Sequence, residues 1–294
     1  MRELIKQNVC LKREYETFIE YIDVSQKTIE SYKNGLKSLF EYFERNNIVE
    51  PTRKDIKSFR DELKSNCSSN TVNSYMTGVR EFFKYLEMLK LYENISDGIK
   101  GAKVSKTPKK QILSKEQVTT IYKSLTDKRE KALFGLLIST GLRGVEVANA
   151  RIEDLKYYNN EITLWIQCKG HTQKDEYVKI SDKVFNDIKE YVGDRKTGYL
   201  FVGNGNNNNG KQLTTKTLRL TIKNIFKRFD LDSDGFSLHS TRRTFATIAY
   251  DNGADIYSIQ QVLHHANIST TTIYLNSADR NKNNTEYGVS ACLD

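Results

Sequence analysis

The N-terminal third of the chain has apolar residues that recur every three or four positions. Residues 28–43 place Tyr32, Leu36, Leu39 and Phe40 on one stripe, a spacing typical of an amphipathic helix. The same period predicts helices at residues 54–63 and 70–89. Amphipathic helices of this length bury their stripes against one another, so residues 1–100 are predicted to form a small helical bundle.

The remainder of the chain mixes helical and strand patterns. Helical periods run through residues 114–125, 128–139, 181–192 and 214–229. Between them, residues 161–167 and 175–180 alternate in polarity and are rich in Ile, Thr, Trp, Val and Tyr, which predicts two antiparallel strands. The fold class is therefore mainly α with a small antiparallel β-hairpin or sheet (α+β).

Residues 236–274 gather most of the chemically unusual side chains. His239 and Arg242 are three residues apart, so on a helix they share one face. Gly253 is expected to take a left-handed conformation where that helix ends, and Asp255 is expected to cap a second helix. The buried stripe of this second helix would contain Ile256, Ile259 and Leu263.

Two imidazoles and a phenol follow on the same segment. The second helix ends at His264 and His265, and Tyr274 comes nine residues after His265. A tyrosine hydroxyl has a pKa of about 10 and needs a base or a positive field to act as a nucleophile. Arginine matches two phosphate oxygens at once, so the combination favours attack of the phenol on a phosphodiester. An isolated His-x-x-Arg pair is also common in purely structural roles, so the hypothesis requires a second cluster.

The second cluster lies about 100 residues upstream. Gly141 is expected to end a helix, and Arg143 follows where a loop-to-helix turn would direct it into a cleft. Glu146, three residues later, is expected to brace Arg143. Lys169 and Lys174 lie in the turn between the two predicted strands. From the residues alone Lys169 is best interpreted as an ordinary turn lysine, although an ammonium group on a hairpin tip can also donate a proton to a leaving oxygen.

In order and spacing these motifs resemble the tyrosine recombinases of the phage-integrase type. That family has a Thr-Gly-x-Arg box, a hairpin lysine, a His-x-x-Arg box, a Leu-Gly-His box and a tyrosine nine residues further on. The chain departs from the pattern at two positions, with Arg243 where the family more often has His and His264 where it usually has Gly. Both positions lie beside the catalytic ones, so the departures bear on substrate handling more than on chemistry.

The resemblance implies a two-domain organisation. Residues 1–100 would form a helical core-binding (SAM-like) DNA-binding domain, residues 101–112 a basic interdomain linker and residues 113–294 a catalytic domain. Together the two domains would form a C-shaped clamp on DNA. The weakly apolar end of the chain would dock on a neighbouring protomer.

The resemblance also implies the reaction, which is site-specific DNA recombination without cofactor or metal. The tyrosine attacks the scissile phosphate to give a 3′-phosphotyrosyl link and a free 5′ hydroxyl, and the link preserves the energy needed for rejoining. The implied roles are Tyr274 as nucleophile, Arg143, Arg242 and His265 as donors to the non-bridging oxygens, His239 as acceptor of the tyrosine proton, Lys169 as general acid with Lys174 as its rival, and Glu146 in support. The biological setting would be integration or excision of a mobile element, or resolution of dimers.

The charge of the chain is consistent with a polyanionic partner. The formal net charge is +9 and the pI is about 9.1, and residues 101–112 carry four lysines and no acidic residue. For the basic residues on the N-terminal helices, the alternative to DNA contact is an ordinary solvated surface. The candidate DNA-binding residues are Lys27, Lys33, Arg80, Lys84, Lys106, Lys109, Lys110, Lys174, Arg219 and Arg243. The partners implied by resemblance are double-stranded recombination sites, a homo-tetramer that synapses two sites, and accessory DNA-bending factors.

Other sequence signals narrow the setting. No run of 18 apolar residues and no signal-peptide core is present, which predicts a cytoplasmic, nucleoid-associated protein of a bacterial, phage or mobile-element host. The four cysteines lack CxxC pairs and are expected to be reduced thiols. Cys168 and His171 are three residues apart, but no second ligand pair is near, so zinc is disfavoured.

Two other functions are compatible with part of the pattern. A type IB topoisomerase shares phosphotyrosine chemistry, but chain size and box order favour the recombinase. A DNA-binding architectural protein without catalysis would be expected to lack some motif positions, and all of them are filled here. Phosphate contacts carry no sequence information, so the basic residues named above do not define a DNA target sequence.

Overall fold

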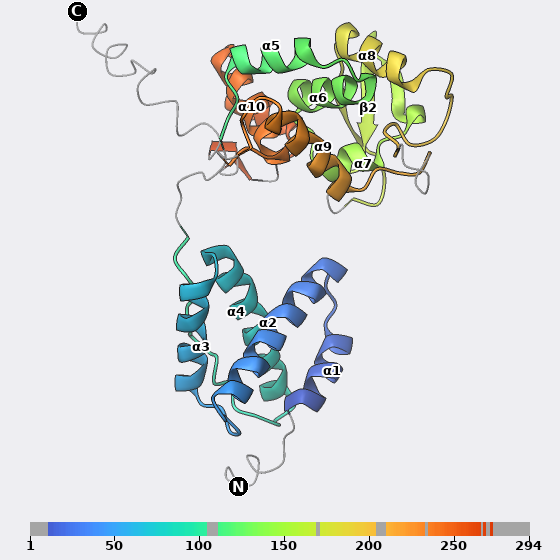
Figure 1. Cartoon of the computed structure of the whole chain (residues 1–294). Coiled ribbons are helices and arrows are strands. Elements are labelled where there is room, and N and C mark those ends of the chain that lie inside the picture. Colours follow the sequence, from blue (N-terminus) through green and yellow to red (C-terminus); the bar gives the residue numbers. More distant parts are fainter. Residues whose placement is uncertain are drawn as a thin grey trace, which may run out of the picture. The chain divides into compact units, whose positions relative to one another are not determined.

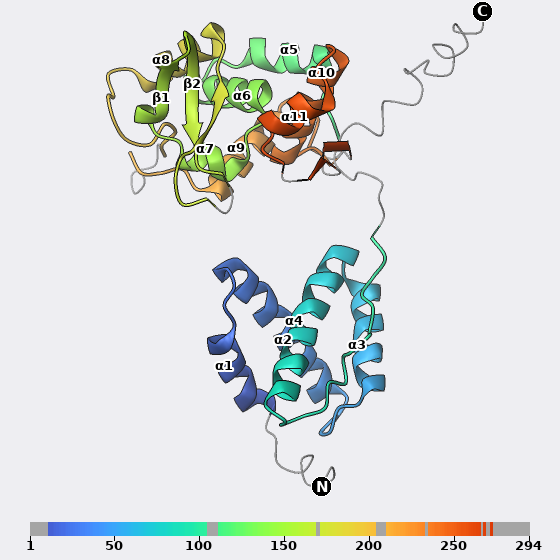
Figure 2. The same cartoon turned by 180° about the vertical axis from the view of Figure 1, so that it is seen from behind.

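The chain consists of two compact units, residues 1–105 and 106–294, each with a hydrophobic core of its own (Figure 1, Figure 2). The computed structural model describes residues 11–104, 111–168, 171–203, 210–232, 235–265, 267–268 and 271–272. Within these residues, no helix combines the length and the apolar character needed to cross a membrane.

The N-terminal unit contains four helices. They are α1 (Leu11–Tyr21), α2 (Gln26–Arg45), α3 (Arg53–Asn66) and α4 (Ser69–Met88). The three helices predicted from the periodicity are all present, with ends shifted by one to three residues. Helix α1 was not predicted, although Leu11, Tyr15, Phe18 and Ile19 recur at helical spacing and pack into the core of the bundle.

Helices α2 and α4 approach each other closely at two glycines. A Cβ atom added at Gly35 would lie 2.8 Å from Cα of Tyr75, and one added at Gly78 would lie 3.0 Å from Cα of Tyr32. These separations are too short for any side chain to fit without moving the partner backbone. The two glycines therefore set the spacing at which the apolar stripes of α2 and α4 close the bundle core.

The C-terminal unit is mainly helical with one small sheet. Its helices are α5 (Lys115–Ser124), α6 (Lys128–Thr140), α7 (Gly144–Asn149), the short 3₁₀ helix η2 (Ile152–Asp154), α8 (Asp182–Val192), α9 (Thr215–Lys227), α10 (Leu238–Asp251) and α11 (Ile256–Val262). The strands β1 (Leu155–Tyr158), β2 (Glu161–Ile166) and β3 (Glu176–Lys179) form an antiparallel sheet in the order β1-β2-β3. The predicted α+β class is confirmed.

The sheet has one strand more than the sequence pattern predicted. Strands β1 and β2 are joined by the two-residue turn Asn159–Asn160, and Tyr158 pairs with Glu161 across it. Both asparagines have positive φ, 48° and 64°, as a type I′ hairpin turn requires. Asparagine tolerates this conformation well, so the Asn-Asn pair was a readable hairpin signal.

Helix α6 is the central element of the C-terminal core. Its residues Leu133, Phe134, Leu136 and Leu137 are fully buried, and the inward residues of β2 and β3 belong to the same apolar cluster. Figures 1 and 2 both show α6 between the sheet and α10. The end of α6 is therefore held by its neighbours, and the candidate site is built around that end.

Candidate active site

The turn after α6 depends on glycine for two reasons. Gly141 has φ +64°, the left-handed conformation, and its N–H donates to the carbonyl of Leu137 at 3.0 Å. A Cβ atom at this position would lie 2.7 Å from side-chain atoms of both Leu263 and Phe245. The predicted helix end is confirmed, and the close approach brings α10 and α11 against the turn.

Glu146 binds back to Arg143 at the start of α7. The carboxylate of Glu146 accepts the backbone N–H of Arg143 at 2.6 Å through Oε2 and the Nη1 of its guanidinium at 2.7 Å through Oε1. The side chain of Glu146 is fully buried, whereas that of Arg143 is 25% exposed. Glu146 thus holds both the backbone and the head group of Arg143, as the sequence predicted for a bracing carboxylate.

Arg242 comes from α10 and reaches the same place. Its Nη1 donates to the carbonyl of Gly141 at 2.7 Å, and its Nη2 donates to the carbonyl of Leu263. Only 3% of the residue is exposed. A guanidinium so deeply buried and bound to two carbonyls fixes the turn after α6 and the end of α11 relative to α10.

The second arginine is tied to the same end of α11. Arg143 Nη2 donates to the carbonyl of His264 at 3.3 Å, and His264 has the left-handed φ of +48°. Glycine adopts this conformation freely and histidine does so less often, which gives the departure from the family's usual Gly a structural cost. The imidazole of His264 lies 3.5 Å from the carboxylate of Glu176 on β3, joining α11 to the sheet.

His265 is buried next to both arginines. Its Nδ1 lies 2.8 Å from the hydroxyl of Thr271, and its carbonyl accepts a hydrogen bond from Gln260 Nε2 at 2.9 Å. Burial lowers the pKa of His265 to about 4, and the charges of Arg242 and Arg143 add to the effect. The ring is therefore neutral at pH 7 and presents a single N–H.

A cavity of about 1200 Å³ opens beside this cluster. Its wall includes Arg143, His171, Glu176, His264 and His265. Burial raises the pKa of the Cys168 thiol, also in this wall, to about 11, so the thiol is protonated at neutral pH. Among the described residues, no group of three or more His, Cys, Asp and Glu side chains is arranged to hold a metal ion.

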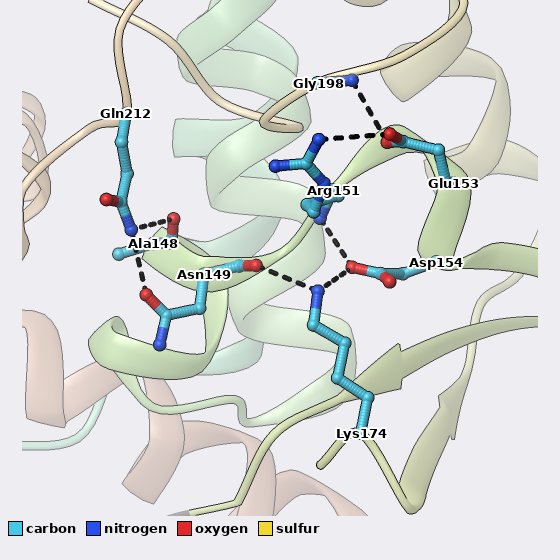
Figure 3. A network of polar contacts seen from close by, with 8 residues as sticks. All are labelled: Ala148, Asn149, Arg151, Glu153, Asp154, Lys174, Gly198 and Gln212. Carbon is cyan, nitrogen blue, oxygen red and sulfur yellow. Dashed lines mark hydrogen bonds and ion pairs between the residues drawn. The ribbon is translucent and has the colours of Figure 1, made fainter. Parts of the chain in front are cut away.

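Lys174, the rival candidate for the general acid, is engaged in a polar network outside the wall of the cavity. Figure 3 shows its ammonium group directed at the carboxylate of Asp154 and at the carbonyl of Asn149, which it contacts at 3.1 Å. The side chain of Asp154 is 13% exposed and that of Lys174 is 25% exposed. Lys174 therefore fastens the connection between β2 and β3 to the end of α7.

The same network is reinforced from other parts of the unit. Gln212 donates to the carbonyl of Ala148 at 3.0 Å and to the side chain of Asn149 at 2.8 Å (Figure 3). Glu153 accepts the N–H of Gly198 at 3.0 Å (Figure 3). The segment after α7 is consequently held by three chain regions that are remote in sequence.

The other predicted site residues have different outcomes. His239 is exposed on the first turn of α10, three residues before Arg242 as predicted. Tyr274 and Lys169 lie outside the described residues, as do Lys106, Lys109 and Lys110 of the linker, and the roles predicted for them stay predictions. Arg143, Arg242 and His265, which come from distant segments, are brought together by the fold.

The candidate DNA-binding residues differ in exposure. Exposed positions are taken by Lys27, Lys33, Lys84 and Arg219. Arg243 is only 5% exposed, which disfavours it as a phosphate contact in this conformation. The guanidinium of Arg80 donates to the hydroxyl of Thr77 at 3.2 Å and lies 3.5 Å from the carbonyl of Ile99.

Arg80 belongs to a set of side chains that fasten residues 97–102 to the N-terminal unit. Asn73 accepts the N–H of Ala102 at 2.8 Å and donates to its carbonyl at 3.0 Å. Arg60 donates to the carbonyl of Lys100 at 3.3 Å, and Arg53 donates to that of Asp97. The first two residues of the predicted linker, Gly101 and Ala102, are thus part of the N-terminal unit.

Comparison with known proteins covers both units. The profile of the phage integrase family matches residues 111–281, and that of the phage integrase N-terminal SAM-like domain matches residues 15–90. Matches of this kind on both units define the class of site-specific tyrosine recombinases, which cleave and rejoin DNA strands. The chain belongs to the phage integrase family.

Similar proteins come from archaea and bacteria. Tyrosine recombinase XerA of Pyrococcus horikoshii is 31% identical over 269 residues, which are 91% of this chain and 89% of that protein. Tyrosine recombinase XerC of Leptospira interrogans is 27% identical over 280 residues, covering 88% of this chain and 86% of that protein. The similarity therefore extends over nearly the whole length of each chain.

Solved structures share the fold. The XerH recombinase bound to difH in a pre-cleavage complex has a TM-score of 0.70 at 21% identity, with 91% of this chain and 81% of that chain covered. The lambda integrase tetramer bound to a Holliday junction has a TM-score of 0.74 at 15% identity, with 92% and 79% covered. Both agree with the arrangement of helices and sheet described above.

Proposed function

We propose that the chain cleaves and rejoins double-stranded DNA through a covalent link between Tyr274 and a 3′ phosphate. The observation that carries the proposal is the convergence of Arg143, Arg242 and His265 beside one cavity, from segments about 100 residues apart. Such a concentration of N–H donors suits a phosphorane-like transition state with charge on its non-bridging oxygens.

The reaction consists of one displacement and its reverse. The Tyr274 oxygen forms a bond to phosphorus, the bond from phosphorus to the 5′ oxygen breaks, and the tyrosine proton passes to His239. The 5′ oxygen takes a proton from Lys169. In rejoining, a 5′ hydroxyl attacks the phosphorus, the bond from phosphorus to the Tyr274 oxygen breaks, and the protons return to Tyr274 and Lys169.

The donors have distinct geometries. Arg143 is partly exposed and lines the cavity, which favours it as the arginine that contacts a phosphate directly. Arg242 is almost fully buried and holds the backbone of Gly141 and Leu263, so part of its contribution is to support the turn that carries Arg143. His265 adds the N–H of a neutral ring, and Glu146 keeps Arg143 in place.

Between the two lysines, the contacts favour Lys169 as the general acid. Lys174 is engaged by Asp154 and Asn149 and is not part of the cavity wall, and a proton donor held there by a carboxylate is poorly suited to a leaving oxygen. Lys169→Ala is therefore expected to slow cleavage far more than Lys174→Ala. Equal losses of cleavage rate in the two variants would make Lys174 an equal candidate for the general acid.

A nicked suicide substrate provides the direct test. When the nick lies next to the scissile phosphate, the short 5′ product diffuses away and the covalent adduct accumulates. Wild type is expected to form the adduct and Tyr274→Phe to form none, whereas an adduct with both proteins would exclude Tyr274 as the nucleophile. Absence of the adduct with both would favour a DNA-binding protein without catalysis.

The wider assembly belongs to the same proposal. Two sites held by a homo-tetramer follow from the need to exchange strands, and the lambda integrase tetramer at a Holliday junction offers a parallel for that arrangement. Deletion of residues 286–294 is expected to weaken assembly on DNA, and unchanged assembly would reject a docking role for the tail. The proposal also includes a core-binding domain over 1–100, to which Gly101 and Ala102 are fastened, a linker over the rest of 101–112 and a catalytic domain over 113–294. Accessory DNA-bending factors and action at the nucleoid in the cytoplasm complete it.

DNA contact by the N-terminal unit can be tested on one helix. Lys84 is exposed on α4, whereas Arg80 on the same helix faces the segment 97–102. Lys84→Glu is expected to lower affinity and reduce the salt dependence of binding, since each phosphate contact releases counterions. An unchanged salt slope would remove Lys84 from the DNA-binding surface.

A further inference from the structure

The hydroxyl of Thr271 contacts the imidazole of His265 inside the protein. Thr271 Oγ1 and His265 Nδ1 are 2.8 Å apart, Thr271 is fully buried and His265 is 8% exposed. Thr271 belongs to none of the sequence boxes that assign catalytic roles. Because a buried hydroxyl needs a hydrogen-bond partner, the imidazole and Thr271 satisfy each other.

The backbone around His265 fixes where its ring lies. The N–H of His265 donates to the carbonyl of Gln260 at 3.1 Å, and its carbonyl accepts from the side-chain amide of the same residue at 2.9 Å. With the backbone held in this way and Nδ1 in contact with Thr271, the ring has a defined position in the wall of the cavity. The remaining variable is which ring nitrogen carries the hydrogen.

The position of that hydrogen decides what the ring can do. A neutral imidazole has one nitrogen that donates and one that accepts, and the non-bridging oxygens of a phosphate only accept. Thr271 occupies Nδ1, so a donation from His265 to a phosphate has to come from Nε2. A hydroxyl can either donate or accept, and only its donation to Nδ1 is compatible with a hydrogen on Nε2.

We propose that Thr271 is a positioning residue that donates its hydroxyl hydrogen to Nδ1 of His265 and thereby holds the ring hydrogen on Nε2, directed to a phosphate oxygen. The inference rests on the proposed function, in which His265 is a donor to the scissile phosphate. It adds a specific requirement, because a histidine in the opposite tautomer would present a lone pair to an anion and repel it.

The test combines nitrogen NMR with cleavage on the full chain. ¹⁵N-histidine spectra distinguish a ring nitrogen that carries a hydrogen from one that does not, and the His265 signals are assigned by their loss in His265→Asn. The spectra are recorded without DNA for wild type, Thr271→Val and Thr271→Ser. Single-turnover cleavage of the nicked substrate is measured for the same proteins and for His265→Ala.

Thr163→Val is the matched control. Thr163 is as fully buried as Thr271, and its hydroxyl donates to the carbonyl of Lys156 at 3.0 Å on the sheet, outside the cavity wall. The substitution therefore removes the same atom from an equally buried place. It is expected to leave both the His265 spectrum and the cleavage rate unchanged.

The expected result is a single Nε2–H form in wild type and in Thr271→Ser. Thr271→Val is expected to show a mixture of the two forms and to cleave about tenfold more slowly, the scale of one lost hydrogen bond. A hydrogen on Nδ1 in wild type would overturn the inference outright, and this readout remains valid if Thr271→Val fails to fold. Slower cleavage by Thr271→Val with an unchanged His265 spectrum would also overturn it.

One further outcome separates this inference from the proposed function. If Thr271→Val changes the tautomer and leaves cleavage unchanged, Thr271 is not a positioning residue for the reaction. His265→Ala then shows whether the donor itself has failed: full activity in that variant removes His265 from the proposed mechanism, and lost activity keeps it there.

Discussion

Two turns in the C-terminal unit are built on the same local pattern and serve different ends. At the start of α7, Glu146 accepts the backbone N–H of Arg143 at 2.6 Å, and at the start of η2, Asp154 accepts that of Arg151 at 2.7 Å. Both are an arginine followed three residues later by an acid, with the carboxylate capping the helix. The first turn presents its own arginine to the cavity, whereas the second binds a lysine from elsewhere.

The difference follows from the length of the acid and the surroundings of the arginine. Glu146 is one methylene longer than Asp154 and reaches back to the guanidinium of Arg143 at 2.7 Å. The carboxylate of Asp154 instead receives Lys174, while Arg151 pairs with Glu153 at 3.2 Å and stacks over the ring of Tyr199. The same local pattern thus braces a cavity-lining arginine in one place and anchors a lysine in the other.

Replacing each of the two arginines in turn is expected to show the largest functional difference between the two turns. Arg143→Ala is expected to slow cleavage by about 10²–10³-fold, the usual effect of losing one donor to a developing oxyanion. Arg151→Ala should leave cleavage nearly unchanged and lower stability by about 1 kcal/mol or less, as partly exposed ion pairs do. Single-turnover adduct formation and chemical denaturation measure the two effects, and comparable cleavage rates in the two variants would contradict the distinction.

Shortening Glu146 tests the argument from side-chain length. Glu146→Asp is expected to retain the cap, as Asp154 does, and to lose the contact with the Arg143 guanidinium. Cleavage should fall by about tenfold, the scale of one hydrogen bond, with the fold of the unit intact by circular dichroism. The matched change Asp154→Glu should not affect cleavage to that extent, and a wild-type rate in Glu146→Asp would show that bracing is unimportant.

The anchor should act on stability more than on chemistry. Asp154→Asn can still cap η2 and leaves the ammonium group of Lys174 without its carboxylate, at an expected cost of about 1–3 kcal/mol for a charged hydrogen bond. Lys174→Met should cost a similar amount, and the double variant should cost little more than either single one, since the pair is lost only once. Chemical denaturation of wild type and the three variants gives a double-mutant cycle of unfolding free energies. Strict additivity of the two single losses would mean that the two residues do not interact.

The smallest expected effect is on the titration of His265. Burial is the main cause that lowers its pKa to about 4, followed by the charges of Arg242 and Arg143. Arg143→Ala should therefore raise the pKa only modestly, and Arg151→Ala should not change it. An NMR titration of the His265 ring measures its pKa in both variants. An equal pKa shift in the two variants would mean that the net charge of the protein, and not the nearby Arg143, causes the effect.

The sign of the pH dependence follows from the same lowered pKa. The ordinary histidine pKa is 6.5, so between pH 6.5 and about 4 the unfolded chain binds a proton that the folded chain does not. His265 thus has no destabilising effect above pH 6.5, and stability decreases as the pH falls from 6.5 toward about 4. The dependence should be weaker in His265→Asn, and an unchanged pH profile would show that the buried ring does not control it.

Much of the fold could be predicted because its signals are local. The left-handed Gly141, the break at Gly253 with φ +91°, and the cap at Asp255, whose side chain accepts from two backbone N–H groups at 2.9 Å, each depend on one residue and its neighbours. Strand β1 was missed because a four-residue strand with mainly exposed positions has no alternating burial pattern, although its Asn-Asn turn was visible.

The site was only partly predictable because its contacts cross long stretches of sequence. The spacing of the boxes indicated that Arg143, Arg242 and His265 act together. The carbonyls that receive the arginines carry no residue-specific signal, because any amino acid at position 263 offers the same acceptor as Leu263. In the same way, Asp154 and Lys174 are separated by 20 positions in the sequence, so no local pattern indicates the contact that holds the lysine.

The pairing of Asn73 with Ala102 also has a consequence for how DNA is captured. Leu113 is fixed within the C-terminal unit, where its N–H donates to the hydroxyl of Thr244 at 2.9 Å. The tether between the two anchored ends is therefore residues 103–112, which spans at most about 40 Å when fully extended. In the proposed capture of DNA by both units, binding of one unit to a duplex would keep the attachment point of the other within that length. The second encounter would then be intramolecular, and its rate would not depend on the amount of protein in solution.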